Sequence, residues 1–124
     1  MSIEERRYPR IGPVLVRTDC HRGDQNWDGY LTSLSEGGAY LVTDEDVPIG
    51  EKLSLYFHLP WQLGNIEVDA EIVYTISEAD AKPEGYPAGA GLAFVAPTAE
   101  QVGRLREYVA RFQKLAGRLS RMEA

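Results

Sequence analysis

The sequence predicts an all-β fold, a small six-stranded antiparallel β-barrel followed by one C-terminal α-helix. Three observations predict it. Six short segments have the alternation or the β-branched and aromatic content of strands. Glycine, proline and serine punctuate the chain between these segments. The final segment instead repeats its apolar residues every three or four positions, as a helix does. With 124 residues the chain is long enough for one domain with a real core.

The first half of the chain contains three of these strands. Pro13 to Cys20 is predicted to form the first strand, and His21 to Asn26 a turn. Trp27 to Leu34 is predicted to form the second strand and Ala39 to Thr43 the third. Between them, Ser35-Glu36-Gly37-Gly38 indicates a tight turn, because its glycines are free to adopt φ > 0.

The second half supplies the other three strands. After a turn at Val47 to Gly50, the segment Leu53 to Leu59 alternates apolar and polar residues. Ile66 to Ile76 has the cleanest period of two in the chain. Glu78 to Gly89 contains two prolines and a glycine between its ends and is predicted to be a surface loop, and Gly91 to Val95 is the sixth strand.

The last segment is a helix whose start can be read from the sequence. Thr98 and Gln101 have the spacing of a capping box, and Pro97 precedes them. Positive charge gathers toward the C-terminal end, where it complements the helix dipole. The predicted apolar stripe consists of Val102, Leu105, Val109, Phe112, Leu119 and either Leu115 or Ala116.

Composition narrows the functional classes. The net charge of −6 argues against a general nucleic-acid-binding protein, which needs a basic surface. No run of residues is apolar enough to span a membrane, and the single Cys20 fits a reducing cytoplasm. We therefore expect a cytoplasmic protein. No group of residues resembles a catalytic constellation, so we expect a binding protein and not an enzyme.

Several conspicuous residues have an ordinary structural interpretation as well. Trp27, Tyr30 and Tyr40 could stack on an aromatic ligand, but barrel packing is the favoured role for each. Cys20 and His21 are adjacent and point to opposite faces of a strand, which argues against a shared metal site. We expect exposed side chains at His58 and in the Asp44 to Asp46 turn. The loop residue Trp61 is also expected to be exposed and to mark a contact patch.

Two short motifs carry the functional signal. Arg6-x-x-x-Arg10 places two guanidinium groups four residues apart near the N-terminus. Ser33-x-Ser35-x-x-Gly38 places hydroxyls and a glycine at the end of a strand. Together, on a barrel with a terminal helix, they resemble the PilZ family, whose signature is RxxxR followed by (D/N)xSxxG. Ser33 stands where that family has Asp or Asn.

The resemblance implies a bacterial receptor for the second messenger cyclic di-GMP, acting in processes such as motility. It implies one domain over 1–124, with a flexible ligand-binding segment at 1–12, the barrel at 13–97 and the helix at 98–124. The implied ligand-binding residues are Arg6, Arg7, Arg10, Ser33, Ser35, Gly37 and Gly38. Arg7 has a supporting role in this set.

Two alternatives stay open for the function, together with a weaker third, a generic small-barrel interaction module in which the motif is a coincidence. In the first, cyclic di-GMP folds the N-terminal segment against the barrel and so changes what an effector protein meets. In the second, a divergent adaptor no longer binds nucleotide and acts only through protein contacts. In either case we expect a monomer or a weak homodimer whose seam follows the C-terminal helix, and no metal or other cofactor.

Overall fold

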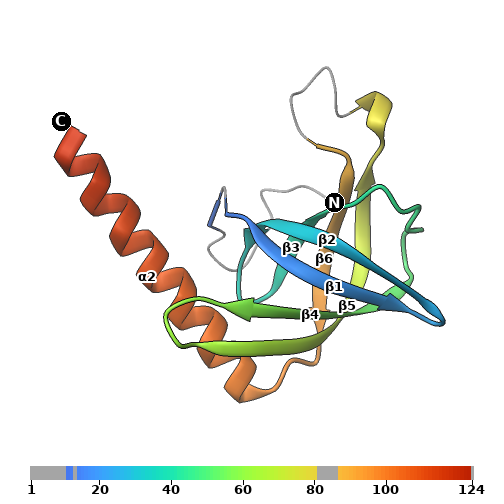
Figure 1. The fold of residues 1–124 in the computed structure, drawn as a ribbon, viewed down its shortest axis with the longest axis horizontal. Coiled ribbons are helices and arrows are strands. Elements are labelled where there is room, and N and C mark those ends of the chain that lie inside the picture. Colours follow the sequence, from blue (N-terminus) through green and yellow to red (C-terminus); the bar gives the residue numbers. More distant parts are fainter. Residues whose placement is uncertain (1–10, 13, 81–86, 124) are drawn as a thin grey trace.

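A computed structural model of the chain describes residues 11–12, 14–80 and 87–123, and the side chains as far as residue 118. Six antiparallel strands close into a barrel in the order β1-β2-β3-β6-β5-β4, with one long helix beside it (Figure 1). The predicted fold is confirmed. The strands are β1 (Val16–Arg22), β2 (Gln25–Leu34), β3 (Gly38–Val42), β4 (Lys52–Leu59), β5 (Gly64–Ile76) and β6 (Gly89–Val95), and the helix is α2 (Ala99–Glu123).

The β1–β2 hairpin is tighter than the sequence suggested. The predicted turn at His21 to Asn26 is wrong at both ends, because His21 pairs with Asn26 and Arg22 pairs with Gln25 across the two strands. Gly23, at φ 60°, lets the chain reverse over two residues. The polar residues beside the turn are therefore strand residues whose side chains face solvent.

Alternation along the strands builds the core. In β4 every second side chain, from Leu53 to Leu59, is buried, and β5 continues the pattern from Ile66 to Ile72. Cys20 is fully buried as well, and burial raises the pKa of its thiol to about 12, so it is a packed apolar residue. The largest fully buried side chains are Phe57, Leu31, Leu34, Leu41, Leu55, Leu59, Ile66, Ile72, Leu92 and Leu105.

The loops on either side of β4 and β5 follow the predictions except at one end. The turn before β4 is confirmed, with Gly50 at φ 92° and Glu51 N–H donating to the Pro48 carbonyl at 3.3 Å. The loop predicted to run to Gly89 is shorter, because Gly89 already pairs with Val42 and Ile76. Strand β6 therefore begins two residues before the predicted start. Residues 81–86 of this loop lie outside the described part of the chain.

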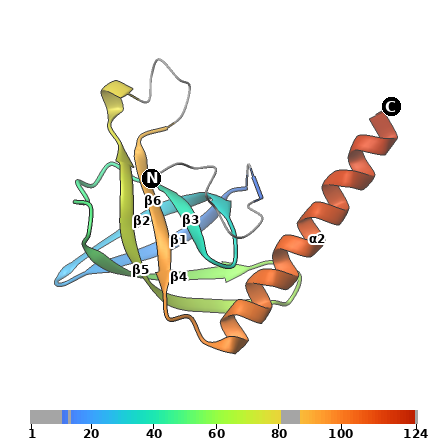
Figure 2. The ribbon, with the colours of Figure 1, turned by 180° about the vertical axis from the view of Figure 1, so that it is seen from behind.

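The helix starts as its capping box predicts. Thr98 N–H donates to Gln101 Oε1 at 2.9 Å, and Gln101 N–H donates to Thr98 Oγ1 at 3.1 Å. Within the described residues, no helix combines the length and the apolar character needed to span a bilayer, and α2, although 25 residues long, has no sufficiently apolar stretch. Beyond its first half the helix projects past the barrel, as two opposite views show (Figures 1 and 2).

Only part of the predicted stripe packs on the barrel. Leu105 and Val109 are buried, while Val102 and Phe112 are half-buried. Tyr108, which the predicted stripe omitted, is buried with 4% exposure. Its spacing of three from Leu105 was the available signal. Farther along, Leu115 is 45% exposed and Ala116 is also exposed.

Candidate functional site

The turn between β2 and β3 is organised by the hydroxyl of Ser35. Its Oγ accepts hydrogen bonds from the N–H groups of Gly37 at 3.1 Å and Gly38 at 3.0 Å. The hydroxyl proton is directed to the Gly38 carbonyl at 3.3 Å, which also accepts the Ser35 N–H at 2.9 Å. Ser35 is 3% exposed. The side chain therefore holds the turn in one shape.

Gly38 is needed for a close approach between strands. A Cβ added to it would lie 2.1 Å from the Leu92 carbonyl oxygen on β6. Its φ is outside the left-handed region, so the expected conformational freedom is not used at this position. Gly37 contributes its carbonyl, which accepts the Phe94 N–H at 2.9 Å. These contacts fasten the turn to β6.

Ser33 lies on the outer face of the barrel, one residue before the end of β2. The β2–β3 register shifts between Leu31 and Ser33, and Ser33 stands opposite Tyr40. Because the two neighbours of Tyr40 on β3 are fully buried, Tyr40 and Ser33 face outward. The Ser33 side chain is half-buried.

The two described residues that follow the N-terminal motif lie beside the end of β2. Ile11 N–H donates to the Leu34 carbonyl at 3.0 Å, and Leu34 N–H donates back to the Ile11 carbonyl at 3.1 Å. A Cβ on Gly12 would lie 3.5 Å from the Ser33 Cβ. The segment after the first motif thus runs antiparallel to the residues that begin the second.

The arginines themselves cannot be placed. Arg6, Arg7 and Arg10 lie outside the described residues. The described residue that follows the arginine motif is Ile11, which pairs with Leu34. Leu34 lies between Ser33 and Ser35 of the second motif, about twenty residues away in sequence.

Barrel packing, the role predicted for three aromatic side chains, is observed for two of them. Tyr40 is 8% exposed, its hydroxyl donates to the Pro87 carbonyl at 2.7 Å, and burial raises its pKa to about 12. Its ring lies 6.2 Å from that of Tyr74 across Gly91, where a Cβ would meet the Tyr74 ring at 2.0 Å. Trp27 is half-buried against the core. Barrel packing is confirmed for Tyr40 and Trp27, but Tyr30 is 44% exposed, because it lies on the outward side of β2.

Sequence reasoning missed an ion pair that ties the turn to the helix. Arg106 on α2 donates to both carboxylate oxygens of Glu36, through Nε at 2.8 Å and through Nη2 at 3.2 Å. The guanidinium of Arg106 lowers the pKa of the Glu36 carboxyl. The two residues are 70 positions apart, and no local pattern signals such a pair.

The structure also has a hollow away from this turn, and that hollow does not suit an anionic ligand. It has a volume of about 1080 Å³ and lies at the end of β3 opposite Gly38. Its lining includes the carboxylates of Asp44, Glu45, Asp46 and Glu78. These like charges would repel phosphate groups, so the geometry favours the turn at 35–38 as the candidate site.

Comparison with solved structures shows the same fold in other proteins. The inhibitor of motility MotI/DgrA of Bacillus subtilis superposes with a TM-score of 0.73 at 21% identity, over 90% of this chain and 52% of that one. YcgR from Escherichia coli, in complex with c-di-GMP, gives 0.79 at 15% identity, over 97% and 51%. The chain thus spans about half the length of both. The PilZ domain of YcgR with c-di-GMP gives 0.68 at 17%, over 94% and 97%.

Comparison with curated proteins finds no match. The family described as the PilZ domain, in contrast, matches residues 4–111. That span includes both motifs, all six strands and α2 as far as Arg111. The resemblance first seen in two short motifs therefore extends over most of the sequence, and this chain belongs to the PilZ domain family.

Proposed function

We propose that this protein is a cyclic di-GMP receptor that binds its ligand beside the turn at 35–38 and signals through a partner protein. One observation carries the proposal. Ile11, the residue after the arginine motif, pairs through its backbone with Leu34, the residue between Ser33 and Ser35, and this pairing supports a site shared by the two motifs. Membership of the PilZ family and the c-di-GMP in the YcgR structures support the choice of ligand.

The chemistry of the motifs suits this ligand. A guanidinium can fork onto phosphate oxygens or onto guanine O6 and N7, so Arg6 and Arg10 can grip either part of a cyclic dinucleotide, with Arg7 in support. Ser33 offers a short hydroxyl on the outer face of the barrel. Ser35, Gly37 and Gly38 hold the turn and bring its backbone close to the ligand.

Binding would also order the N-terminal segment. Fixing a residue's backbone costs roughly 1–2 kcal/mol, whereas one good bidentate contact contributes about 1–3 kcal/mol. Two arginines alone do not order residues 1–10 at that rate. Contacts between the ligand and the barrel must contribute as well, and the ordered segment then presents a new surface to an effector in the cytoplasm.

A second candidate function is an adaptor that binds no nucleotide. Two observations favour it. Ser33 is shorter than the Asp or Asn of the family motif, and the Ser35 hydroxyl already makes three hydrogen bonds within its own turn. Such a protein would act only through protein contacts. An unmade contact to a polar ligand group costs about 1–3 kcal/mol, which weakens binding without abolishing it.

Isothermal titration calorimetry with purified protein and cyclic di-GMP decides between the two. The receptor should release heat with saturable binding, more weakly at physiological salt than at low salt, because phosphate contacts are screened. Cyclic di-AMP should bind less well, since it lacks guanine O6. Absence of saturable heat at both salt concentrations would leave the adaptor as the remaining candidate.

A further inference from the structure

Beyond the nucleotide site, the structure has an apolar groove where α2 leaves the barrel. Trp61, in the β4–β5 turn, is 40% exposed, and its ring lies 5.4 Å from that of Tyr108. Tyr108 also lies 6.4 Å from Phe112 and borders a hollow of about 410 Å³ shared with Leu15. Leu15 is 74% exposed. Apolar side chains therefore lie on both sides of this hollow, Leu15 just before β1 and Tyr108 on the helix, although its lining also includes Arg17, Asp19 and His58.

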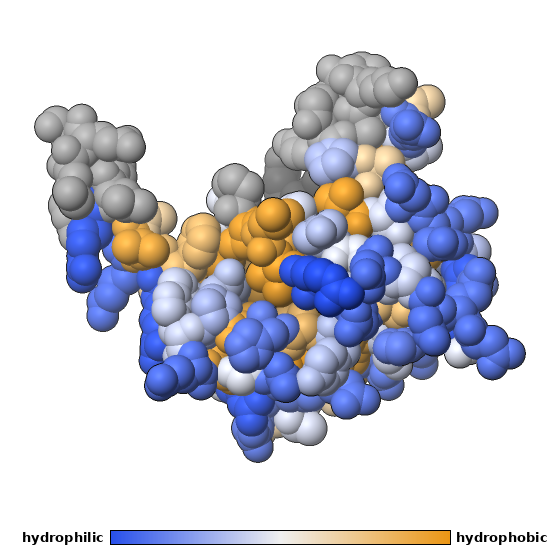
Figure 3. Space-filling model, in the orientation of Figure 1, coloured by the Kyte–Doolittle hydropathy of each residue, from blue (hydrophilic) through white to orange (hydrophobic). Residues whose placement is uncertain are grey.

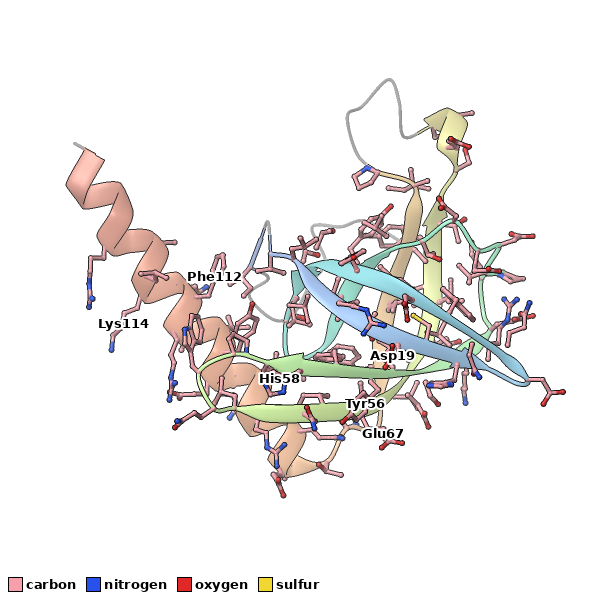
Figure 4. The ribbon with its side chains drawn as sticks, viewed as in Figure 1. Asp19, Tyr56, His58, Glu67, Phe112 and Lys114 are labelled. Atoms are coloured by element: carbon pink, nitrogen blue, oxygen red, sulfur yellow. The ribbon has the colours of Figure 1, made fainter. Side chains whose placement is uncertain are left out.

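The projecting part of α2 adds another apolar side chain. Leu115 lies one turn after Phe112 and is 45% exposed. Figure 4 shows Phe112 directed toward the barrel and Lys114 directed away from it. Hydrophobic surface is visible both on the projecting helix and on the adjoining part of the barrel (Figure 3). We call Leu15, Trp61, Phe112 and Leu115 the apolar groove.

Two features of the fold present this groove to a partner. Trp61 and Gln62, at φ 61° and 63°, are the central residues of a turn that the Leu63 N–H closes on the Pro60 carbonyl at 3.2 Å, so the turn fixes the position of Trp61. In addition, residues 113–118, which continue α2 past the part packed on the barrel, are exposed or nearly so. An apolar partner laid along this part of the helix would stabilise it.

Charge indicates the kind of partner. Arg111, Leu115 and Arg118 are four and three residues apart, so the two arginines edge the groove on the Leu115 side. Arg111 donates to the Trp61 carbonyl at 3.3 Å and pairs with Glu107, while Arg118 has no ion pair among the described residues. This basic edge lies on a chain of net charge −6. It complements an acidic ligand.

We infer that the groove docks an acidic amphipathic helix of a different protein. A second copy of this chain fits less well, since it would bring Arg111 and Arg118 against their own like charges. A membrane surface fits less well too, because the groove is concave between helix and barrel whereas interfacial helices present a free apolar face. The inference holds for a receptor and for an adaptor, so it does not rest on nucleotide binding.

The test uses fluorescence anisotropy with the full chain and designed helical peptides of about 18 residues, five turns. One peptide carries a leucine stripe flanked by glutamates, and its counterpart carries lysines instead. The acidic peptide should bind, and Leu115→Asp or Arg118→Glu should each weaken it at least tenfold, as loss of a central contact does.

Two variants serve as matched controls. Lys114→Glu makes the same charge change as Arg118→Glu, on the face directed away from the barrel. Ile49→Asp changes another exposed apolar residue, 64% accessible, in the loop before β4. Both should bind the acidic peptide within about twofold of the unmodified chain, because neither position borders the groove.

Other outcomes would overturn the inference. These are no binding of the acidic peptide, equal binding of the lysine peptide, or equal weakening by Lys114→Glu. Sedimentation equilibrium tests whether a second copy of the chain occupies the groove, and vesicle flotation tests whether a membrane does. A tight homodimer that Leu115→Asp dissociates would assign the groove to a second copy, and flotation with anionic phosphatidylglycerol vesicles in preference to the peptide would assign it to a membrane.

Discussion

At the scale of single residues, the hydroxyl of Ser35 is fully engaged within its own turn. Its acceptor and donor positions are already used by Gly37 and Gly38. Any direct bond to a ligand must replace the one to the Gly38 carbonyl. At the proposed site, the main contribution of Ser35 would therefore be a turn that is already in shape before the ligand arrives, which lowers the ordering cost of binding.

The arginine motif gives the first prediction. Arg6→Ala and Arg10→Ala should each weaken cyclic di-GMP binding by about 5- to 150-fold, because each removes a charge-assisted fork worth roughly 1–3 kcal/mol. Thermal unfolding should be unchanged, as neither residue belongs to a periodic core pattern. Calorimetry measures the affinity.

Arg17→Ala is the matched control for both variants. Arg17 is exposed and pairs with Asp19 at 3.2 Å and Asp28 at 2.8 Å on the β1–β2 face. Its loss should leave the affinity within about twofold, since exposed pairs contribute little. Unchanged affinity in Arg6→Ala and Arg10→Ala would contradict the proposed site.

Ser33 gives the second prediction. Ser33→Asn and Ser33→Asp restore the acceptor typical of the family motif, on an outward position beside Gly12. Affinity for cyclic di-GMP should rise by about five- to tenfold, within the range of one recovered polar contact, while cyclic di-AMP should gain little. Titration of both variants with both nucleotides checks this. No gain in either variant would mean that the pocket differs from the family pattern at more than this residue.

The third prediction concerns Gly38. Gly38→Ala should lower the free energy of unfolding by about 1–3 kcal/mol or more, because its Cβ would lie 2.1 Å from the Leu92 carbonyl oxygen. Gly103→Ala is the control, since a Cβ there meets nothing within 4 Å. It should raise stability by about 0.5–1 kcal/mol through helix propensity. Urea unfolding of both variants measures these changes. Changes in unfolding free energy of the same sign in the two variants would refute the packing argument.

The sequence predicted some of these residues and not others, because it reveals local motifs but not contacts between distant elements. Ser33, Ser35 and Gly38 could be singled out because a turn motif is local. The pairing of Ile11 with Leu34 could not, since it depends on strand register across the barrel. Glu36 was passed over because its partner Arg106 is on another element.

At the scale of elements, periodicity predicted the strands better than their ends. The six strands and the capping box of α2 were predicted correctly because alternation and caps are encoded locally. The β1–β2 hairpin was predicted too loosely, since His21 and Asn26 are polar yet pair in the ladder. Tyr108 was missed because an aromatic residue with a polar hydroxyl was not counted in the apolar stripe.

The fourth prediction concerns the contact between the 35–38 turn and α2. Glu36 has a lowered pKa in the folded state, so its pairing with Arg106 stabilises the fold above the unfolded pKa of about 4.3. That contribution is lost as the pH falls through the folded pKa. The loss of stability in Arg106→Gln, no more than about 1 kcal/mol, should therefore be largest near neutral pH and vanish in acid.

A double-mutant cycle isolates this pair. In a Glu36→Gln background the same Arg106→Gln change should lose that pH dependence. Urea unfolding from neutral to acidic pH provides the measurement. A pH-independent effect of Arg106→Gln in both backgrounds would show that its role lies in other contacts.

At the scale of the whole molecule, the barrel and the projecting helix are distinct parts with different surfaces. The barrel holds the core and the turn at 35–38, while the distal part of α2 extends past it (Figure 2). The Glu36–Arg106 pair joins the turn to the packed half of the helix. A ligand at the turn would therefore act at one end of an element whose other end bears the apolar groove.

The last prediction separates these two parts. Truncation after Gln113 removes the end of α2. Its residues as far as 118 are exposed, except for Gly117, which is half-buried and has no side chain. Stability and cyclic di-GMP affinity should therefore stay within experimental error of the intact chain. Phe112→Ala in the full chain is the contrast, because Phe112 packs against the core, and it should cost about 1–2 kcal/mol of unfolding free energy.

The same truncation tests the association state. We predict a monomer or weak homodimer for the intact chain, because the apolar stripe that α2 offers to a helical pair, over its described side chains, is short and is edged by Arg111 and Arg118. Sedimentation equilibrium should show any weak dimer disappearing after truncation. A strong dimer that persists in the truncated chain would place the seam on the barrel, where it could cover the 35–38 turn and compete with the ligand.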